Sequence, residues 1–143
     1  MKTFSPVVKY DSLRIILSIA AAQDLDLFQF DVSSAFLYGD LAEEIYLEQP
    51  EGFRSPGREG DVYRLHKCLY GLKQAGRVWN AKFDGLVTAF GLTPSSVDPC
   101  VYYYRKENVV LILCLWVDDG LLVCNTAKLV SELFTYLQAN RLG

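Results

Sequence analysis

The feature that most constrains this sequence is a nine-residue apolar run, Val109–Val117, which ends at two adjacent carboxylates, Asp118 and Asp119. A membrane-spanning helix needs about 20 apolar residues, so the run predicts a buried strand. Asp-Gly between two apolar stretches is a common β-hairpin signal, and the stretch Leu121–Cys124 follows Gly120. One interpretation therefore makes the acidic pair a surface turn.

A third carboxylate, Asp31, ends another predicted strand. The segment Leu25–Val32 reads LDLFQFDV, and its alternation puts Phe28 and Phe30 on one face and Asp31 on the other. If this strand ends beside the hairpin, three carboxylates converge. Such a set would hold two magnesium ions about 4 Å apart, which together with substrate phosphates support an in-line displacement. The residues alone leave the turn and the metal site open.

Composition narrows the chemistry. The chain has 143 residues, of which 51% are hydrophobic, which suits one domain with a sizeable core. His66 is the only histidine, so most histidine-based catalysis and most transition-metal sites are excluded. No secretory leader pattern opens the chain. The cysteines form no C-x-x-C pair, and we expect reduced core thiols of an intracellular protein: Cys68, Cys100, Cys114 and Cys124.

Charge is unevenly distributed. The net charge is −3, but residues 54–82 carry +5 and the remainder carries −8. A basic segment on an acidic body can attract a polyanion, although a solvated surface explains it equally well. The basic residues of the segment are Arg54, Arg58, Arg64, Lys67, Lys73, Arg77 and Lys82.

Periodicity and turn residues predict an α+β fold in which helices cover one face of a mostly antiparallel sheet. Besides the strands above, three helices are expected: one capped by Asp11 or Ser12 and ended by Asp24, one at 74–91, and a last one capped by Asn125 or Thr126. A helical turn is expected at 33–39. The expected strands are a hairpin of 43–50 and 61–71, two strands within 98–117 joined at 106–108, and a strand at 121–124.

Several blocks of sequence resemble the reverse transcriptase of copia-like retrotransposons. They are FQFDVSSAFLYGDLAEEIYLEQPEGF, VYRLHKCLYGLKQAGRVWN, SSVDPCVYYY and LWVDDGLLV, and they occur in the family's order over nearly the whole chain. The resemblance implies RNA-directed DNA polymerisation by a single domain over residues 1–143. Its fold would be a polymerase palm-type antiparallel sheet covered by helices, with a partial fingers hairpin at about 44–70 and no thumb.

The resemblance also implies functional residues. Asp31, Asp118 and Asp119 would be catalytic and would bind two Mg²⁺ ions, or Mn²⁺, with Asp118 the more direct ligand. Phe36 would exclude a ribose 2′-OH, the group that distinguishes RNA from DNA, or would serve as a core residue of a short helix. Nucleotide binding would involve Val32, Phe36, Tyr70, Gly71 and Lys73, of which the last three also suit an ordinary strand-to-helix turn. Nucleic-acid contacts would come from Arg64, Lys67 and Arg77.

Implied partners are an RNA template, a DNA primer and deoxynucleoside triphosphates. The thumb, ribonuclease H and integrase portions of the parent polyprotein would lie outside this chain. The expected location is intracellular, in a cytoplasmic retroelement particle or in the nucleus, and no membrane partner is expected. The chain departs from the family pattern at Gly76, usually proline, and at Trp116, usually tyrosine; Gly120 is expected to loosen the turn. A catalytically silent palm, a nucleic-acid-binding or interaction module, and another palm-type nucleotidyl enzyme such as a cyclase remain open alternatives.

Overall fold

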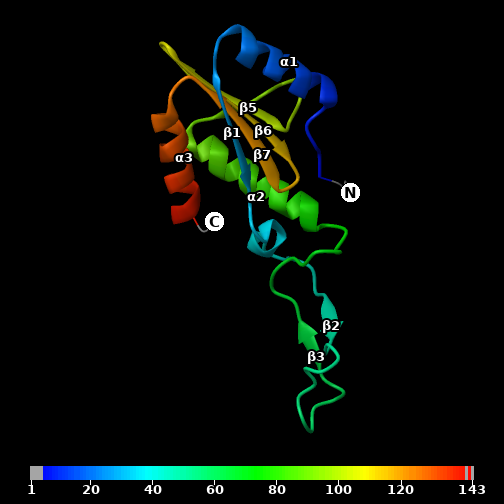
Figure 1. Ribbon diagram of the computed structural model, residues 1–143. Helices are drawn as coiled ribbons and strands as arrows, with labels where there is room; N and C mark the ends of the chain where they lie inside the picture. The colour runs from blue at the N-terminus through cyan, green and yellow to red at the C-terminus, as the bar shows by residue number, and fades with distance from the viewer. Residues whose placement is uncertain (1–4, 141, 143) are drawn as a thin grey trace.

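A five-stranded antiparallel sheet forms the body of the molecule, and a two-stranded arm projects from it (Figure 1). The computed structural model describes residues 5–140 and residue 142. In spatial order the sheet contains β1 (Asp26–Asp31), β7 (Asp119–Cys124), β6 (Val109–Trp116), β5 (Val101–Lys106) and β4 (Thr93–Pro94). The arm pairs β2 (Tyr46–Glu48) with β3 (Val62–Arg64).

Helices cover both faces of the sheet, not one face as the sequence led us to expect. The helical elements are α1 (Tyr10–Ala22), the 3₁₀ turn η1 (Ala35–Tyr38), α2 (Ala75–Phe90) and α3 (Ala127–Ala139). α1 packs on one face, where its Leu13 borders a cavity with Leu121 of β7. On the other face, Phe83 of α2 and Phe134 of α3 both contact Phe30 of β1. The reason is β6, which is apolar at consecutive positions and therefore needs cover on both sides.

Most of the strongly patterned elements are confirmed. β1 and α2 occupy the predicted segments, the two arm strands pair, and β5 and β6 are joined at Glu107 and Asn108. Three differences concern the sheet: the arm strands are shorter than predicted, β4 was not predicted, and β7 begins at Asp119, not at Leu121. Gly120 therefore lies within β7, opposite Phe30, and the expectation that it loosens the turn is wrong.

The start of α1 also corrects the sequence prediction. The N-cap is Lys9, and neither Asp11 nor Ser12 occupies that position. Instead the buried carboxylate of Asp98 accepts the Lys9 N–H at 2.9 Å and the Cys100 N–H at 3.0 Å, and Ser12 also donates to it. Burial alone would raise the pKa of Asp98, but these hydrogen bonds hold it below its ordinary value. Asp98 thus fastens α1 to the start of β5.

The four cysteines are buried and free, as expected for reduced core residues. Burial raises the pKa of Cys100 to about 11 and that of Cys114 to about 12. Both thiols are therefore protonated near neutral pH and behave as small apolar side chains. Within the described part of the chain, no helix is long and apolar enough to cross a membrane.

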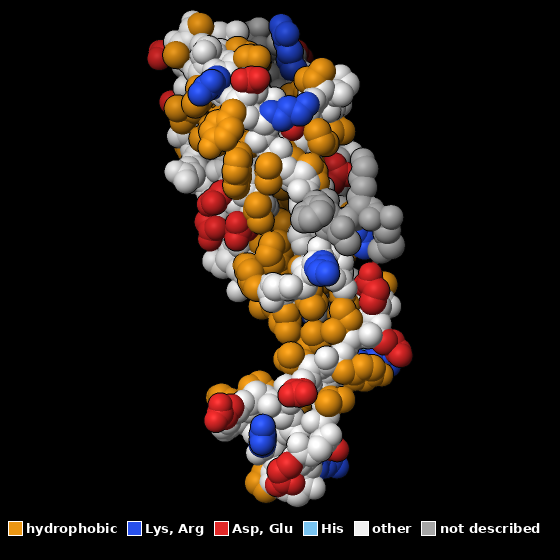
Figure 2. Space-filling view, turned by 90° about the vertical axis from the view of Figure 1, so that its right-hand side faces the viewer, with side chains coloured by type: hydrophobic (Ala, Val, Ile, Leu, Met, Phe, Trp, Pro, Cys, Tyr) orange, Lys and Arg blue, Asp and Glu red, His pale blue; other side chains and the backbone are white. Residues whose placement is uncertain are grey.

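Hydrophobic side chains remain exposed on the arm and on the face of the body shown in Figure 2. On the arm they include Tyr46, Val62 and Tyr63, together with Phe53 in the loop, which is 76% exposed. The arm has no core of its own, because every residue of β2 and β3 is exposed.

Candidate catalytic site

The register of the sheet brings Asp31 and Asp119 together. Asp31, the last residue of β1, is paired directly with Asp119, the first residue of β7. Side chains directly opposite one another in an antiparallel pair share a face, with Cβ atoms typically about 5 Å apart. Asp118 lies one residue earlier, in the two-residue turn that joins β6 to β7. Residues separated by more than 80 positions in the chain thus meet at one end of the sheet.

The oxygen ligands available here suit magnesium, which prefers carboxylates and keeps several waters. Asp31 and Asp119 are exposed and Asp118 is half-buried. Among residues 5–140, no Lys or Arg forms an ion pair with any of the three. The side chains are not, however, arranged as a ready cation site: the described residues contain no group of three or more His, Cys, Asp or Glu that could hold a metal ion.

Two cavities flank the carboxylates. Asp119 borders a cavity of about 280 Å³ between the sheet and the start of α1. Asp31 borders a different cavity of about 280 Å³, between β1 and α3. Gln29 of β1 lines both cavities. Asp31 and Asp119, although paired with each other, therefore border two different cavities.

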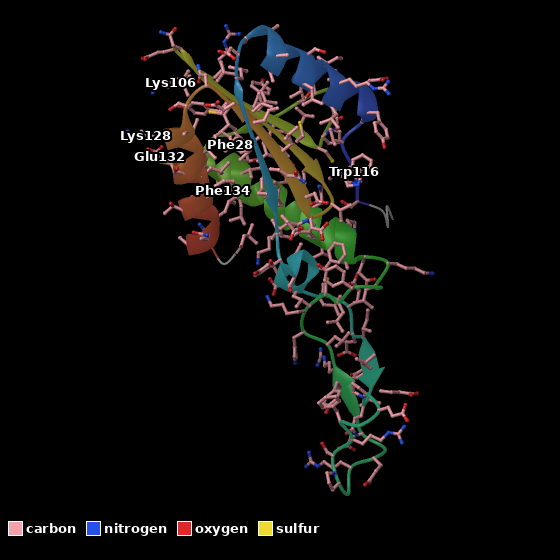
Figure 3. All side chains as sticks on the ribbon, in the orientation of Figure 1. Phe28, Lys106, Trp116, Lys128, Glu132 and Phe134 are labelled. Carbon is pink, nitrogen blue, oxygen red and sulfur yellow. The ribbon has the colours of Figure 1, made fainter. Side chains whose placement is uncertain are left out.

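Aromatic side chains line the approach to Asp119. Trp116, the last residue of β6, is paired with Asp119 and lies beside the start of α1 (Figure 3). Its ring makes an edge-to-face contact with Tyr10, with centroids 5.8 Å apart. Trp116 also lines the cavity that Asp119 borders. Trp116 thus places an indole ring next to Asp119.

The turn that carries Asp118 is held from two sides. The indole N–H of the buried Trp79, on α2, donates to the Val117 carbonyl at 2.7 Å. The backbone N–H of Val32, itself buried, donates to the Asp118 carbonyl at 3.0 Å. Val117 has φ +59°, a conformation that β-branched residues rarely adopt. Sequence analysis predicted the helix that carries Trp79 but gave no sign of this contact.

Phe36 and Tyr70, both expected at a nucleotide site, are in contact. Their ring centroids lie 4.6 Å apart, although they are separated by the whole arm. Phe36, in η1, is half-buried, and Tyr70 is 55% exposed. Gly71 has φ +93°, which suits the turn that the alternative interpretation assigned to it, and Lys73 is exposed.

The three basic residues expected to contact nucleic acid are all ion-paired. Arg64 pairs with Glu44 at 3.0 Å, Arg77 pairs with Glu43 at 3.8 Å, and Lys67 pairs with Asp40. The three acids belong to the segment between η1 and β2. We name these acids, Asp40, Glu43 and Glu44, the acidic triplet. It neutralises part of the positive charge that the sequence showed in residues 54–82.

Comparison with known proteins decides the family. The family model "Reverse transcriptase (RNA-dependent DNA polymerase)" matches residues 1–141. The chain belongs to the reverse transcriptase family. It is a copia-like reverse transcriptase segment, as the sequence blocks indicated.

Similar proteins are plant retrotransposon polyproteins. The chain is 52% identical over 131 residues to a Retrovirus-related Pol polyprotein from transposon TNT 1-94 of Nicotiana tabacum, covering 91% of the chain and 10% of that protein. It is 36% identical to Pol polyproteins from transposons RE2 and RE1 of Arabidopsis thaliana, covering 92% and 90% of the chain and 9% of each relative. This reverse transcriptase segment thus spans about a tenth of the length of these relatives. No solved structure matches it.

Proposed function

We propose that this chain is the palm, with part of the fingers, of a copia-like RNA-directed DNA polymerase. The arm with β2 and β3 would be the partial fingers hairpin, and the body would be the palm. The observation that carries the proposal is the pairing of Asp31 with Asp119, next to Asp118 in the turn. A surface turn at Asp118 and Asp119 would need no further carboxylate. Asp31, from a strand some 90 residues earlier, nevertheless lies opposite Asp119.

In the proposed reaction the primer 3′-oxygen bonds to the α-phosphorus of a deoxynucleoside triphosphate, and the bond to the pyrophosphate leaving group breaks. Asp31, Asp118 and Asp119 would hold two Mg²⁺ ions. When bound, such ions lower the pKa of an attacking hydroxyl and stabilise charge on the leaving oxygens. The assignment is supported by the register of β1 against β7, in which Asp31 is paired with Asp119, next to Asp118 in the turn.

The remaining residues would position the substrates. Val32 fixes the Asp118 turn through its backbone N–H. The ring of Phe36, supported by Tyr70, would lie against the sugar and exclude a 2′-OH, while Gly71 and Lys73 would adjoin the triphosphate. Arg64, Lys67 and Arg77 would contact template or primer phosphates, which position nucleic acid without reading its sequence. The RNA template and the DNA primer are partners by family membership.

Primer extension tests the proposal. The chain is given a DNA primer on poly-RNA with Mg²⁺, and incorporation is compared with that of Asp118→Asn. A matched control is Asp26→Asn, which removes the same charge from the opposite end of β1, where Asp26 is exposed. We expect incorporation by the wild type and by Asp26→Asn, and none by Asp118→Asn. Equal incorporation by all three proteins would disprove the assignment of the acids.

A second candidate is a palm that binds nucleic acid without catalysis. The observation that favours it is the lack of a ready metal-holding group among the described residues. This candidate predicts that the chain retards labelled single-stranded RNA in a binding assay while neither the wild type nor Asp118→Asn incorporates nucleotide.

A further inference from the structure

Asp118 is the one proposed ligand that lies in a turn and not in a strand, so the pairing within the named strands does not by itself fix its direction. The direction of a Cα–Cβ bond is set by the two peptide planes on either side of the Cα atom. The plane before Asp118 carries the Val117 carbonyl, and the plane after it carries the Asp118 carbonyl. Each of these oxygens accepts one hydrogen bond from a different element.

The two anchors differ in kind. Val32 reaches the Asp118 carbonyl through its backbone N–H, continuing the pairing of β1 with β7. Trp79 reaches the Val117 carbonyl through its side chain, from α2. A substitution can therefore remove the second anchor without touching the first.

The indole of Trp79 is itself held firmly. Trp79 is completely buried, and its ring packs against Phe83 at 5.5 Å and Tyr38 at 6.4 Å between centroids. The direction of the indole N–H is therefore fixed by the packing of the ring. Val117, which accepts it, holds a left-handed conformation that costs free energy for a β-branched residue. The indole N–H donates to the carbonyl of Val117 while Val117 holds this conformation.

We propose that Trp79 is a positioning residue for Asp118: its indole N–H selects the left-handed conformation of Val117 and thereby sets the direction of the Asp118 carboxylate. The consequence for metal binding rests on the proposed function, whereas the conformational part does not. Trp79 has no direct role in chemistry and acts only through the hairpin turn.

The experiment compares Trp79→Phe, which keeps an aromatic ring and loses the donor, with Val87→Ala. Val87 is equally buried on α2, two turns further along, and has no hydrogen bond to the hairpin, so it controls for loss of packing. Mn²⁺ alone is the probe, and its dissociation constant is measured by titration calorimetry. Backbone amide shifts and nuclear Overhauser contacts of Val117 and Asp118 report the turn without metal.

We expect Trp79→Phe to shift the amide signals of Val117 and Asp118 and to weaken Mn²⁺ binding by about 10- to 100-fold, the usual effect of losing an outer-shell contact. Val87→Ala should lower the free energy of unfolding by a comparable amount. It should nevertheless leave the amide signals of Val117 and Asp118 and the affinity for Mn²⁺ unchanged. Unaltered turn signals in Trp79→Phe would overturn the proposal, as would an equal loss of affinity in Val87→Ala. If the wild type binds no Mn²⁺, the proposed function fails and the turn signals alone decide the role of Trp79.

Discussion

The Phe30 ring fills the space that a side chain at position 120 would need. An ideal Cβ on Gly120 would lie 2.0 Å from Cζ of Phe30 and 2.1 Å from its Cε1. The ring cannot easily retreat, because it packs against Phe83 and Phe134. Glycine is therefore required here for close cross-strand packing, two residues after Asp118, and the φ of Gly120 is not involved.

We predict that Gly120→Ala destabilises the chain by about 1–3 kcal/mol, the usual cost of overpacking a filled core. The measurement is the free energy of unfolding in urea. Gly85→Ala is the matched control, because Gly85 is an exposed helical position with no atom within 4 Å of its added Cβ, and it should stabilise the helix by up to about 1 kcal/mol. If Gly120→Ala costs as much in a Phe30→Leu background, the explanation is wrong.

Replacing the buried carboxylate Asp98 should lower stability near neutral pH. Asp98→Asn keeps the shape but loses charge-assisted hydrogen bonds from Lys9, Ser12 and Cys100, and a hydrogen bond to a charged group typically contributes about 1.5–3 kcal/mol net. We expect a loss of that order in the free energy of unfolding. Asp24→Asn is the control, because Asp24 is exposed and asparagine tolerates its positive φ of 52°.

The same substitution changes the pH dependence of stability. The folded pKa of Asp98 is lowered from 3.8, so its contribution is complete above that pH and is lost as pH falls through the folded pKa. The wild type should therefore lose its advantage over Asp98→Asn in acid, and the two urea midpoints should converge. A constant difference between them down to the lowest pH would show that the charge is not what Asp98 contributes.

If the polymerase assignment holds, Phe36→Ala should admit ribonucleotides. The smaller side chain would open space beside the sugar where the Phe36 ring, backed by Tyr70 at 4.6 Å, now lies. The measurement is the ratio of ribonucleotide to deoxynucleotide incorporation opposite an RNA template. Leu37→Ala, at the next and more exposed position of η1, should leave the ratio unchanged. An unchanged ratio in Phe36→Ala would contradict the proposed exclusion of the 2′-OH and would leave Phe36 as a core residue of η1.

Sequence patterning predicted the parts of this fold that depend on local residues. The apolar run of β6, the alternation of β1 and the amphipathic face of α2 each identify an element without reference to the rest of the chain. The register that places Asp31 opposite Asp119 could be hypothesised because both residues end apolar strands. These elements, and the strand ends that carry Asp31 and Asp119, follow from the residue periods of strands and helices alone.

Contacts between distant residues could not be predicted in this way. Asp98 caps α1 from a position 89 residues away from Lys9, and nothing in the pattern around Ser12 signals this. The indole of Trp79 belongs to a buried helix face by period, yet its N–H points to a carbonyl in the hairpin turn. Gly120 was misread because glycine after two aspartates is typical of a turn, whereas here the packing of Phe30 requires it.

The acidic triplet leads to the last prediction, on nucleic-acid binding. Each acid pairs with one of the basic residues proposed to contact phosphates, and Lys67 lowers the pKa of Asp40. Exposed ion pairs are worth about 0–1 kcal/mol, so a polyanion can compete for these cations, but it must break the pairs to do so. Replacing the acids by Asn, Gln and Gln should therefore strengthen binding of single-stranded RNA, measured by fluorescence anisotropy.

The salt dependence identifies the mechanism. Each phosphate contact adds about 0.7 to the slope of log affinity against log salt for single strands, so three released cations should steepen it by up to about 2. The control replaces three exposed acids of the body, Asp11, Asp24 and Asp26, by asparagine, which changes the net charge equally. Because none of these pairs with the arm or α2 cations among the described residues, the control should raise affinity less and leave the slope nearly unchanged. Equal slopes for the two triple variants would mean that the acidic triplet acts only through net charge, and that Arg64, Lys67 and Arg77 are not the phosphate contacts.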